Sequence, residues 1–229
     1  NPIEMVEGGT QVSGIISEIL VDFNDQVTTG QILAKMDKRN LNSSLLESKS
    51  NLIKAEVALK QTERELKRNQ KLFEQGFIAE TELEKAQYDF ENAKATYTIT
   101  KLQLDKNKVN LGYSNIVSPI DGIVISKNID VGQTIAASFS TPVLFSIAND
   151  LKQMKIEASV DEADIGLVKP NQKVIFSVDA FPDDVFEGVV NQVQLKPTVV
   201  QNVVTYNVIV IIQNPDLKLM PGMTATLII

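Results

Sequence analysis

A long, unbroken repeat of seam positions occupies the middle of this 229-residue chain. From Leu41 these positions follow one another at alternating spacings of four and three residues: Leu41, Leu45, Ser48, Leu52, Ala55, Leu59, Thr62, Leu66, Asn69 and Phe73. A period of about 3.5 residues held over several heptads is typical of a coiled-coil helix and incompatible with a strand, whose side chains repeat every two residues. The repeat therefore predicts one long amphipathic helix.

A second repeat of the same kind follows after a short break. Its positions are Leu83, Ala86, Phe90, Ala93, Tyr97, Thr100, Leu104, Asn107 and Leu111. Two helices of similar length joined by a short loop must run antiparallel. At 1.5 Å per residue each helix would be about 50 Å long. We therefore expect residues 38–111 to form an antiparallel coiled-coil hairpin.

Five residues mark the expected helix ends. Asp37 is a candidate N-cap of the first helix, and Gly76 follows its last seam residue as a C-terminal stop. Thr81 and Glu84 have the spacing of a capping box, and Gly112 closes the second helix. The seam also contains small and polar residues, so it is weaker than an all-leucine seam. The hairpin is either a spacer arm that its own seam stabilises, or an arm that also packs against copies of itself or another helical protein.

The segments on either side of the hairpin resemble each other. Before it stand Gly14-Ile15-Ile16 and Gly30-Gln31-Ile32-Leu33; after it stand Gly122-Ile123-Val124 and Gly132-Gln133-Thr134-Ile135. Each half offers short β-branched strands separated by Gly-containing turns. The strands of one half are too few to bury a sheet face alone. We expect the two halves to pair into one split domain, formed by residues 6–37 and 112–149.

The remainder of the chain has a strand pattern. Apolar residues alternate from Met154 to Val160 and from Val174 to Val178, and residues 203–212 are strongly β-branched. Pro- and Asn-containing turns separate these stretches. This pattern therefore predicts that residues 150–229 form a small antiparallel β-barrel. The complete expectation is an elongated, mixed α and β protein, in which a β-sandwich is interrupted by the helical hairpin and followed by the barrel.

Composition removes several classes of function. The chain has no His and no Cys, which excludes His-based triads, thiol nucleophiles and Cys/His zinc sites. A net charge of −7 argues against general binding of nucleic acid. The acidic residues Asp161, Glu162 and Asp164 fit a helix start, and they lack the glycine and distal glutamate of an EF-hand. We expect no enzyme activity, no cofactor and no metal.

Two stretches next to the hairpin, and one in the barrel region, carry a family resemblance. They are residues 30–37 (GQILAKMD), residues 116–124 (IVSPIDGIV) and the run VDEADI at 160–165 followed by Lys169-Pro170. In this order of elements the chain resembles the membrane fusion proteins, or periplasmic adaptors, of the HlyD, AcrA and MacA type, and MacA-like adaptors in particular. The resemblance covers essentially the whole chain.

The resemblance implies a fold, a location and partners. It implies a lipoyl-like β-sandwich, a hexameric assembly in the periplasm, an inner-membrane transporter and an outer-membrane TolC-like channel that the hairpin tip meets. It favours an ABC-type transporter, with an RND-type transporter as the alternative. It also implies a membrane-proximal domain built from segments outside this sequence. No apolar run of about 18 residues is present, so we expect any membrane anchor to lie outside this sequence as well.

The family often has an Arg, a Leu and a Ser at the hairpin tip. Arg68 and Leu72 match the first two, whereas Ala79 occupies the place of the Ser. The resemblance therefore implies channel docking through this tip and leaves the contribution of the hydroxyl in doubt. Phe77 and Ile78 are either a hydrophobic staple onto the second helix or an apolar contact for the channel.

One loop of the sandwich lines the central passage in MacA-like adaptors, where it carries Gln side chains. The matching loop here includes Ser138, Phe139 and Ser140 and has no Gln. Phe139 is either an ordinary core residue or, if it points inward, one member of an apolar ring that constricts the passage by dewetting.

Two other functions share parts of this pattern. Lipoyl and biotin carriers have similar β half-motifs, and Lys35-Met36 partly matches a biotin site. The hairpin, however, occupies the place of the turn that presents the modified lysine. A coiled-coil scaffold without a role in transport would need the same seam, and the sequence separates it poorly from an adaptor.

Overall fold

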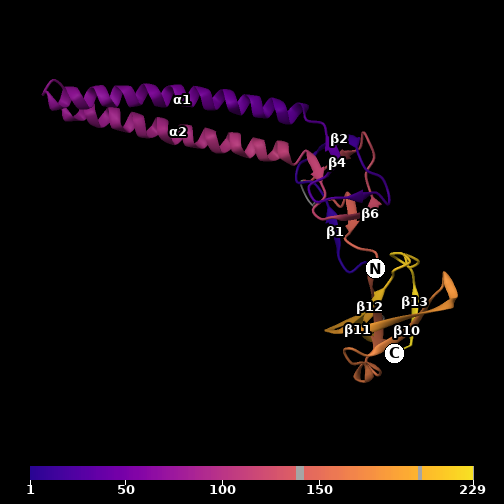
Figure 1. The fold of residues 1–229 in the computed structure, drawn as a ribbon. Coiled ribbons are helices and arrows are strands. Elements are labelled where there is room, and N and C mark those ends of the chain that lie inside the picture. Colours follow the sequence, from indigo (N-terminus) through magenta and orange to yellow (C-terminus); the bar gives the residue numbers. More distant parts are fainter. Residues whose placement is uncertain (138–141, 201–202, 229) are drawn as a thin grey trace.

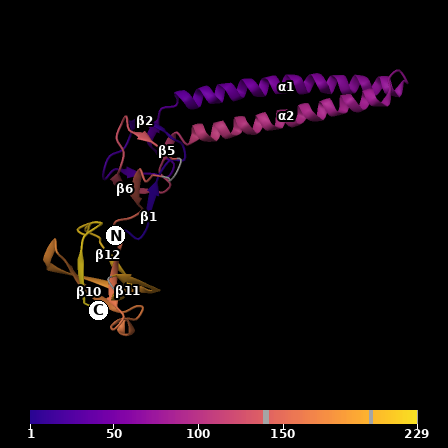
Figure 2. The ribbon, with the colours of Figure 1, turned by 180° about the vertical axis from the view of Figure 1, so that it is seen from behind.

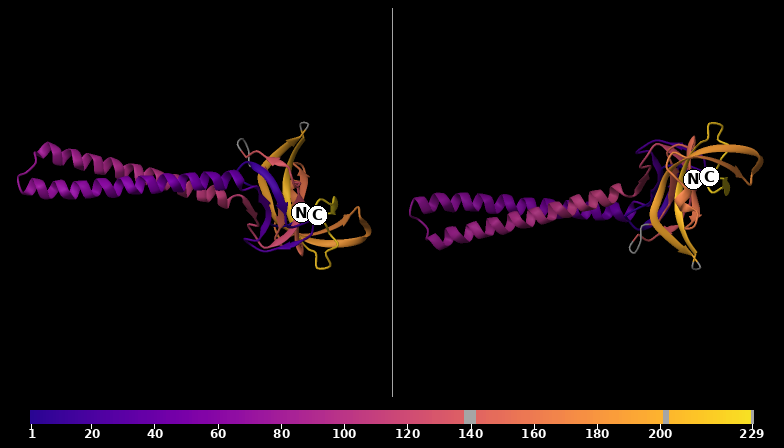
Figure 3. Two further views of the ribbon diagram at one scale, coloured as in Figure 1. Left: turned by 90° about the horizontal axis from the view of Figure 1, so that it is seen from above. Right: turned by 90° about the horizontal axis from the view of Figure 1, so that it is seen from below.

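The computed structural model describes residues 1–137, 142–200 and 203–228. The molecule is elongated, with a helical hairpin at one end, two small β-sheets in the middle and a larger sheet at the other end (Figure 1; Figure 2, from behind). The N and C labels both lie far from the hairpin tip in every view (Figure 3). This mixed α and β architecture confirms the predicted fold class.

The hairpin consists of α1 (Arg39–Glu74) and α2 (Glu80–Gly112), which lie side by side and run antiparallel. The predicted seams face each other: Ser48 and Ala55 of α1 and Ala86 and Leu104 of α2 are the buried residues of the two helices. The other seam positions are half-buried except Phe73, which is 39% exposed. The seam therefore opens at the last turn of α1.

The predicted N-terminal caps are wrong. The N-cap positions are Lys38 and Ala79, and neither side chain makes a capping hydrogen bond. Because α2 begins at Glu80, Thr81 lies inside its first turn, where its hydroxyl is no longer at the capping position. Asp37 does accept a hydrogen bond from the Arg39 N–H at 2.9 Å, but from one position before the cap.

Among the residues that the structure describes, the middle unit takes the four strands before the hairpin and the first four strands after it. The first group is β1 (Met5–Gly8), β2 (Gly14–Ile19), β3 (Gln26–Val27) and β4 (Ile32–Met36). The second group is β5 (Asn115–Val117), β6 (Gly122–Lys127), β7 (Thr134–Ile135) and β8 (Phe145–Ala148).

These strands form two four-stranded sheets, in the orders β1-β8-β6-β3 and β5-β4-β2-β7. Each sheet takes strands from both sides of the hairpin, so the two half-motifs pair with each other as expected. Their shared hydrophobic core includes Leu33, Val124, Phe145 and Ile147, each without measurable exposure. The two helices thus emerge from a single packed unit.

The third unit contains β9 (Gln153–Asp161), the short helix η1 (Ile165–Leu167), β10 (Lys173–Val178), β11 (Phe181–Val200), β12 (Val203–Gln213) and β13 (Ala225–Ile228). The strands form one antiparallel sheet in the order β13-β10-β11-β12-β9. Its core includes Met154, Val174 and Phe176, with Phe176 stacked on Phe186 at 5.4 Å between ring centroids. The sheet curls into a half-barrel (Figure 1).

Candidate functional site

The tip of the hairpin is a tight helix-ending turn. Gly76 adopts a φ of +74°, and its N–H donates to the Phe73 carbonyl at 2.9 Å. The next N–H, from Phe77, donates to the Leu72 carbonyl at 2.9 Å. This pair of bonds is the Schellman motif, which favours glycine because a side chain is strained at that φ. The turn reverses the chain within a few residues, so α2 starts directly beside the end of α1.

The predicted docking residues gather around this turn. Arg68 is exposed on the last turns of α1, Leu72 is half-buried, and Phe77 is 73% exposed in the loop. Ile78 is half-buried, and Ala79 is the extended N-cap residue of α2, with φ −74° and ψ 154°. The tip therefore presents aromatic surface, with Arg68 about two helical turns before Gly76, and it has no hydroxyl at position 79.

Sequence reasoning missed one tip residue. Phe73 was assigned to the seam, but it is partly exposed beside Gly76. The signal was present in the sequence, because Phe73 is the last seam position before the loop. Together with Phe77 it gives the tip two exposed aromatic rings, a surface suited to contact with another protein.

The second predicted site falls outside the described residues. Ser138, Phe139 and Ser140 belong to residues 138–141, so their predicted place in a passage stays a prediction. The last described residue before them is Ala137, whose N–H donates to Ser13 Oγ at 3.0 Å.

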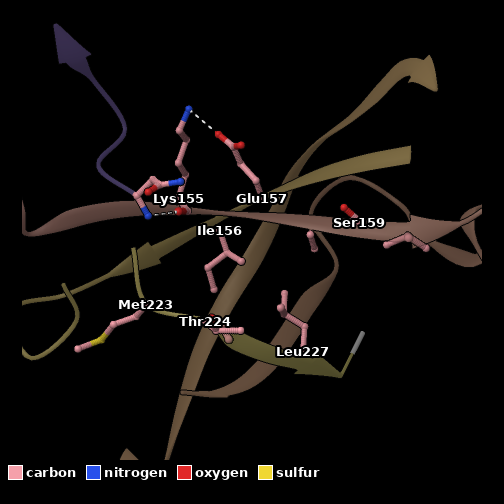
Figure 4. Close-up of a pocket in the computed structure, with 11 residues that line it drawn as sticks. Lys155, Ile156, Glu157, Ser159, Met223, Thr224 and Leu227 are labelled. Atoms are coloured by element: carbon pink, nitrogen blue, oxygen red, sulfur yellow. Dashed lines mark hydrogen bonds and ion pairs between the residues drawn. The ribbon is translucent and has the colours of Figure 1, made fainter. Parts of the chain in front are cut away.

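A cavity of about 410 Å³ lies between the two edge strands of the half-barrel, β9 and β13 (Figure 4). Its lining mixes apolar side chains such as Ile156 and Leu227 with a rim of Lys155 and Glu157, which form an ion pair at 3.0 Å. The backbone of Asn1 exchanges two hydrogen bonds with Lys155 on the same rim. The sequence did not predict this cavity, because its two walls are separated by about sixty residues of chain.

The described residues show no catalytic constellation. No group of three or more acidic residues among them could hold a metal ion. Exposed ion pairs shift the pKa values of two carboxylates: the Arg39 guanidinium lowers the pKa of Asp37, and the Lys67 ammonium lowers the pKa of Glu63. These are surface ion pairs, and neither opens onto a binding pocket.

The carrier alternative fails on the position of its lysine. Lys35 lies inside strand β4, and its ammonium pairs with Glu18 at 2.9 Å. A modified lysine has to stand on an exposed turn, whereas here the chain continues from β4 directly into the hairpin.

In the part of the chain that the structure describes, no helix is both long enough and apolar enough to cross a membrane.

Comparison with known proteins agrees with this architecture. The family model for the "RND MFP, barrel-sandwich hybrid domain" matches residues 4–146, and that for the "CusB-like, beta-barrel domain" matches residues 155–229. The macrolide export protein MacA of Yersinia pestis is 31% identical over 97% of this chain, and the pyoverdine export membrane fusion protein PvdR of Pseudomonas putida is 29% identical over 97%.

A solved structure gives the same picture. A MacA-MexA chimera that contains the Pseudomonas aeruginosa MexA α-hairpin superposes with a TM-score of 0.75 at 28% identity, covering 99% of this chain and 77% of the chimera. The present chain spans 64% of the length of the Y. pestis MacA and 65% of that of PvdR. Since a family model covers residues 4–146, more than half of the sequence, the chain belongs to the membrane fusion proteins and is MacA-like.

Proposed function

We propose that this protein is the periplasmic adaptor of an export system, linking an inner-membrane transporter to an outer-membrane TolC-like channel. Membrane fusion proteins are adaptors and not enzymes, in agreement with the sequence prediction. The relatives named above are a macrolide export protein and a pyoverdine export membrane fusion protein, which supports export as the process. The cargo of this protein is left open, because adaptors need no cargo site.

The observation that carries this proposal is the hairpin. An α1 of 36 residues extends over about 54 Å at 1.5 Å per residue and projects away from both β regions. Its base is tied to the β-strands where β4 enters α1: the Met36 N–H donates to the Ser114 carbonyl and the Asp37 N–H to the Ile15 carbonyl of β2, each at 2.8 Å. A long arm on a firm base fits a protein that spans a gap.

In this proposal the two ends of the molecule bind different partners. The tip, with Arg68, Leu72, Phe77, Ile78 and Ala79, docks onto the open end of the channel. The half-barrel faces the transporter and the membrane. The relatives are longer than this chain, which supports attachment to the inner membrane through segments outside residues 1–229.

The transporter in this proposal is of the ABC type. Support comes from the MacA relative, which matches 97% of the chain. The names of the matching family models point instead to RND systems, so an RND-type transporter is the alternative that the experiment must distinguish. We further propose a hexamer, with domains at 6–37 with 112–149, 38–111 and 150–229, and with Ser138, Phe139 and Ser140 near its central passage.

Affinity purification of the full-length protein from its own cells, after mild cross-linking, tests the proposal. An outer-membrane channel and an ATP-hydrolysing inner-membrane transporter should co-purify. The double variant Arg68→Asp/Leu72→Asp should lose the channel and keep the transporter, whereas Lys101→Asp, an exposed change in mid-α2, should keep both. Recovery of neither membrane partner with the wild-type protein would contradict the adaptor function and favour a scaffold.

A further inference from the structure

Two short linkers join the sandwich to the half-barrel. Residues 2–4 lead into β1, and residues 149–152 connect β8 to β9. The linkers are paired, because the Asn149 N–H donates to the Glu4 carbonyl at 3.2 Å. Within the part of the chain that the structure describes, no hydrogen bond or ion pair joins β1–β8 directly to β9–β13. Units connected in this way can change their relative orientation unless a further contact fixes it.

A cleft of about 530 Å³ opens at this junction. One wall is the end of the sandwich, with Val27 and Ile123; the other carries Leu151 of the second linker and Leu217 of the loop between β12 and β13. This loop, drawn in yellow, lies at the end of the half-barrel nearest the two middle sheets (Figure 1; Figure 2). Leu217 is 47% exposed, so a large apolar side chain stands in an open cleft whose opposite wall is also partly apolar.

The backbone of Leu217 has an unusual conformation. Its φ of +54° lies in the left-handed region, and the other described non-glycine residues with a positive φ are Asn24 and Asn171. Asparagine adopts this conformation readily, whereas a leucine is strained there because its Cβ crowds the backbone. Strain of this kind persists only where the surrounding structure enforces it, and it is concentrated at ligand clamps and switch regions.

The loop that carries Leu217 is held on both sides. The buried Asn214 side chain accepts the Leu219 N–H at 3.0 Å and donates to the Leu219 carbonyl at 2.8 Å. Leu219 is itself buried in the barrel core, and Lys218 forms an ion pair with Asp184 at 2.9 Å. Of the described residues of this loop, only Leu217 lines the cleft. The surrounding contacts therefore hold Leu217 in its strained conformation at the cleft.

The same asparagine fixes the second linker to the half-barrel. Its N–H donates to the Lys152 carbonyl at 2.7 Å, and its Nδ2 atom donates to the Leu151 carbonyl at 2.9 Å. Leu151, Lys152 and Leu217 therefore move with the half-barrel as one body. A change in orientation has to occur on the sandwich side of Leu151, at the exposed residues Asn149 and Asp150.

We propose that Leu217 is a latch between the two units. When the linkers bend, its side chain crosses the cleft and packs against Ile123, which fixes the orientation of the sandwich and its helical arm relative to the half-barrel. Closure removes the exposed surface of Leu217 and the half-buried Ile123 from water, and this burial favours the closed state. The present structure, with its open cleft, shows the unlatched state.

Distance measurements between the two walls test the latch. Because the chain has no Cys, spin labels can be attached at Thr28→Cys and Asp216→Cys alone, two exposed positions on the sandwich and on the Leu217 loop. Double electron–electron resonance on the purified full-length protein should show two populations, one at the open distance and one at a shorter distance. The measurement needs neither membrane partner, so its outcome does not depend on the proposed function.

Leu217→Asn distinguishes a latch from a loop that is merely strained. Asparagine suits the left-handed backbone, so this variant should melt at or above the wild-type temperature, and yet it should reduce the short-distance population several-fold. Ile123→Thr should reduce that population as well, whereas Leu217→Met, which keeps an apolar side chain, should retain it. Leu167→Asn, the same change at a 76% exposed position that does not line the cleft, is the matched control and should leave both populations unchanged.

A single distance in the wild-type protein would overturn the latch, and so would an unchanged short-distance population in Leu217→Asn. The double variant Leu217→Asn/Ile123→Thr should lose no more of this population than Leu217→Asn alone, because each change removes the same contact. Independent, additive losses would contradict direct packing of these two residues.

Discussion

Asn107 on α2 reaches across the seam to Ser48 on α1, with its Nδ2 atom 3.1 Å from Ser48 Oγ and 3.2 Å from the main-chain oxygen of Ser44. Both residues occupy core positions of the heptad repeat, where a polar pair has few alternative partners. A shift of one helix by a single turn would leave this amide without those acceptors. The pair therefore sets the register of the hairpin near its base.

Replacing Asn107 with Ala should lower the free energy of unfolding by about 1 kcal/mol, because two hydrogen bonds are lost and a small gap opens in the seam. Urea titration followed by helical circular dichroism measures this change. Lys101→Ala, at an exposed position of the same helix, is the control and should change stability by less than about 0.5 kcal/mol. Equal stability of the two variants would show that Asn107 does not set the register of the hairpin.

Two glycines at the ends of the helices should respond in opposite ways to alanine. Gly76 has a φ of +74°, so Gly76→Ala should destabilise the protein by about 1 kcal/mol. Gly112 has no positive φ and open space around an added Cβ, so Gly112→Ala should stabilise it by about 0.5 kcal/mol or more. Unfolding curves of the two variants, recorded side by side, should bracket the wild type. A stabilising Gly76→Ala would show that the tip turn differs from the Schellman motif.

Gly122 stands where β6 passes close to β8. A Cβ added there would overlap the main-chain oxygen and carbon of Ala148, and a backbone contact of this kind cannot be relieved by rotating a side chain. Gly122→Ala should therefore lower stability by about 3 kcal/mol or more and reduce the yield of folded protein. Gly166→Ala, which meets nothing within 4 Å, is the control. Thermal denaturation distinguishes the two, and a wild-type melting temperature for Gly122→Ala would contradict the close approach.

Asp121, directly before β6, forms a hydrogen bond with the turn that follows β3. Its carboxylate accepts the Thr29 N–H, and this bond lowers the pKa of Asp121 below its usual value. A lowered pKa in the folded state contributes stability above the unfolded pKa, and that stability is lost as the pH falls through the folded pKa. The melting temperature should thus drop in acid, and Asp121→Asn, which keeps an acceptor oxygen, should drop less. Parallel pH profiles for the two proteins would show that this bond does not matter.

The heptad repeats were enough to predict the hairpin, because a period of 3.5 residues is local and leaves few alternatives. The strand order was beyond reach: β1 pairs with β8 across some 140 residues of chain, and nothing local specifies such a partner. The caps failed for a related reason, since Thr81 satisfies the motif but the helix starts two residues too early for it. Ile53 and Leu102 belong to neither predicted seam, and the structure shows both more than half exposed.

At the hairpin tip, too, the sequence predicted only part of the candidate site. Family resemblance indicated Arg68 and Leu72; the Leu72 carbonyl accepts a hydrogen bond within the Gly76 turn, and Arg68 lies one turn earlier on α1. The exposure of Phe73 and Phe77, by contrast, depends on where the last helical hydrogen bonds fall, which the sequence does not state. A docking role for these residues remains the prediction on which the adaptor account depends.

A disulfide cross-link in intact cells tests that role most directly. A Cys is placed at Leu72 of the full-length protein and a second Cys on the open end of the cognate outer-membrane channel. The account predicts a specific cross-link from position 72 that disappears when the Cys is moved to Leu52 in the middle of α1. No cross-link from any position between 72 and 79, with both proteins present at normal levels, would contradict docking through the tip.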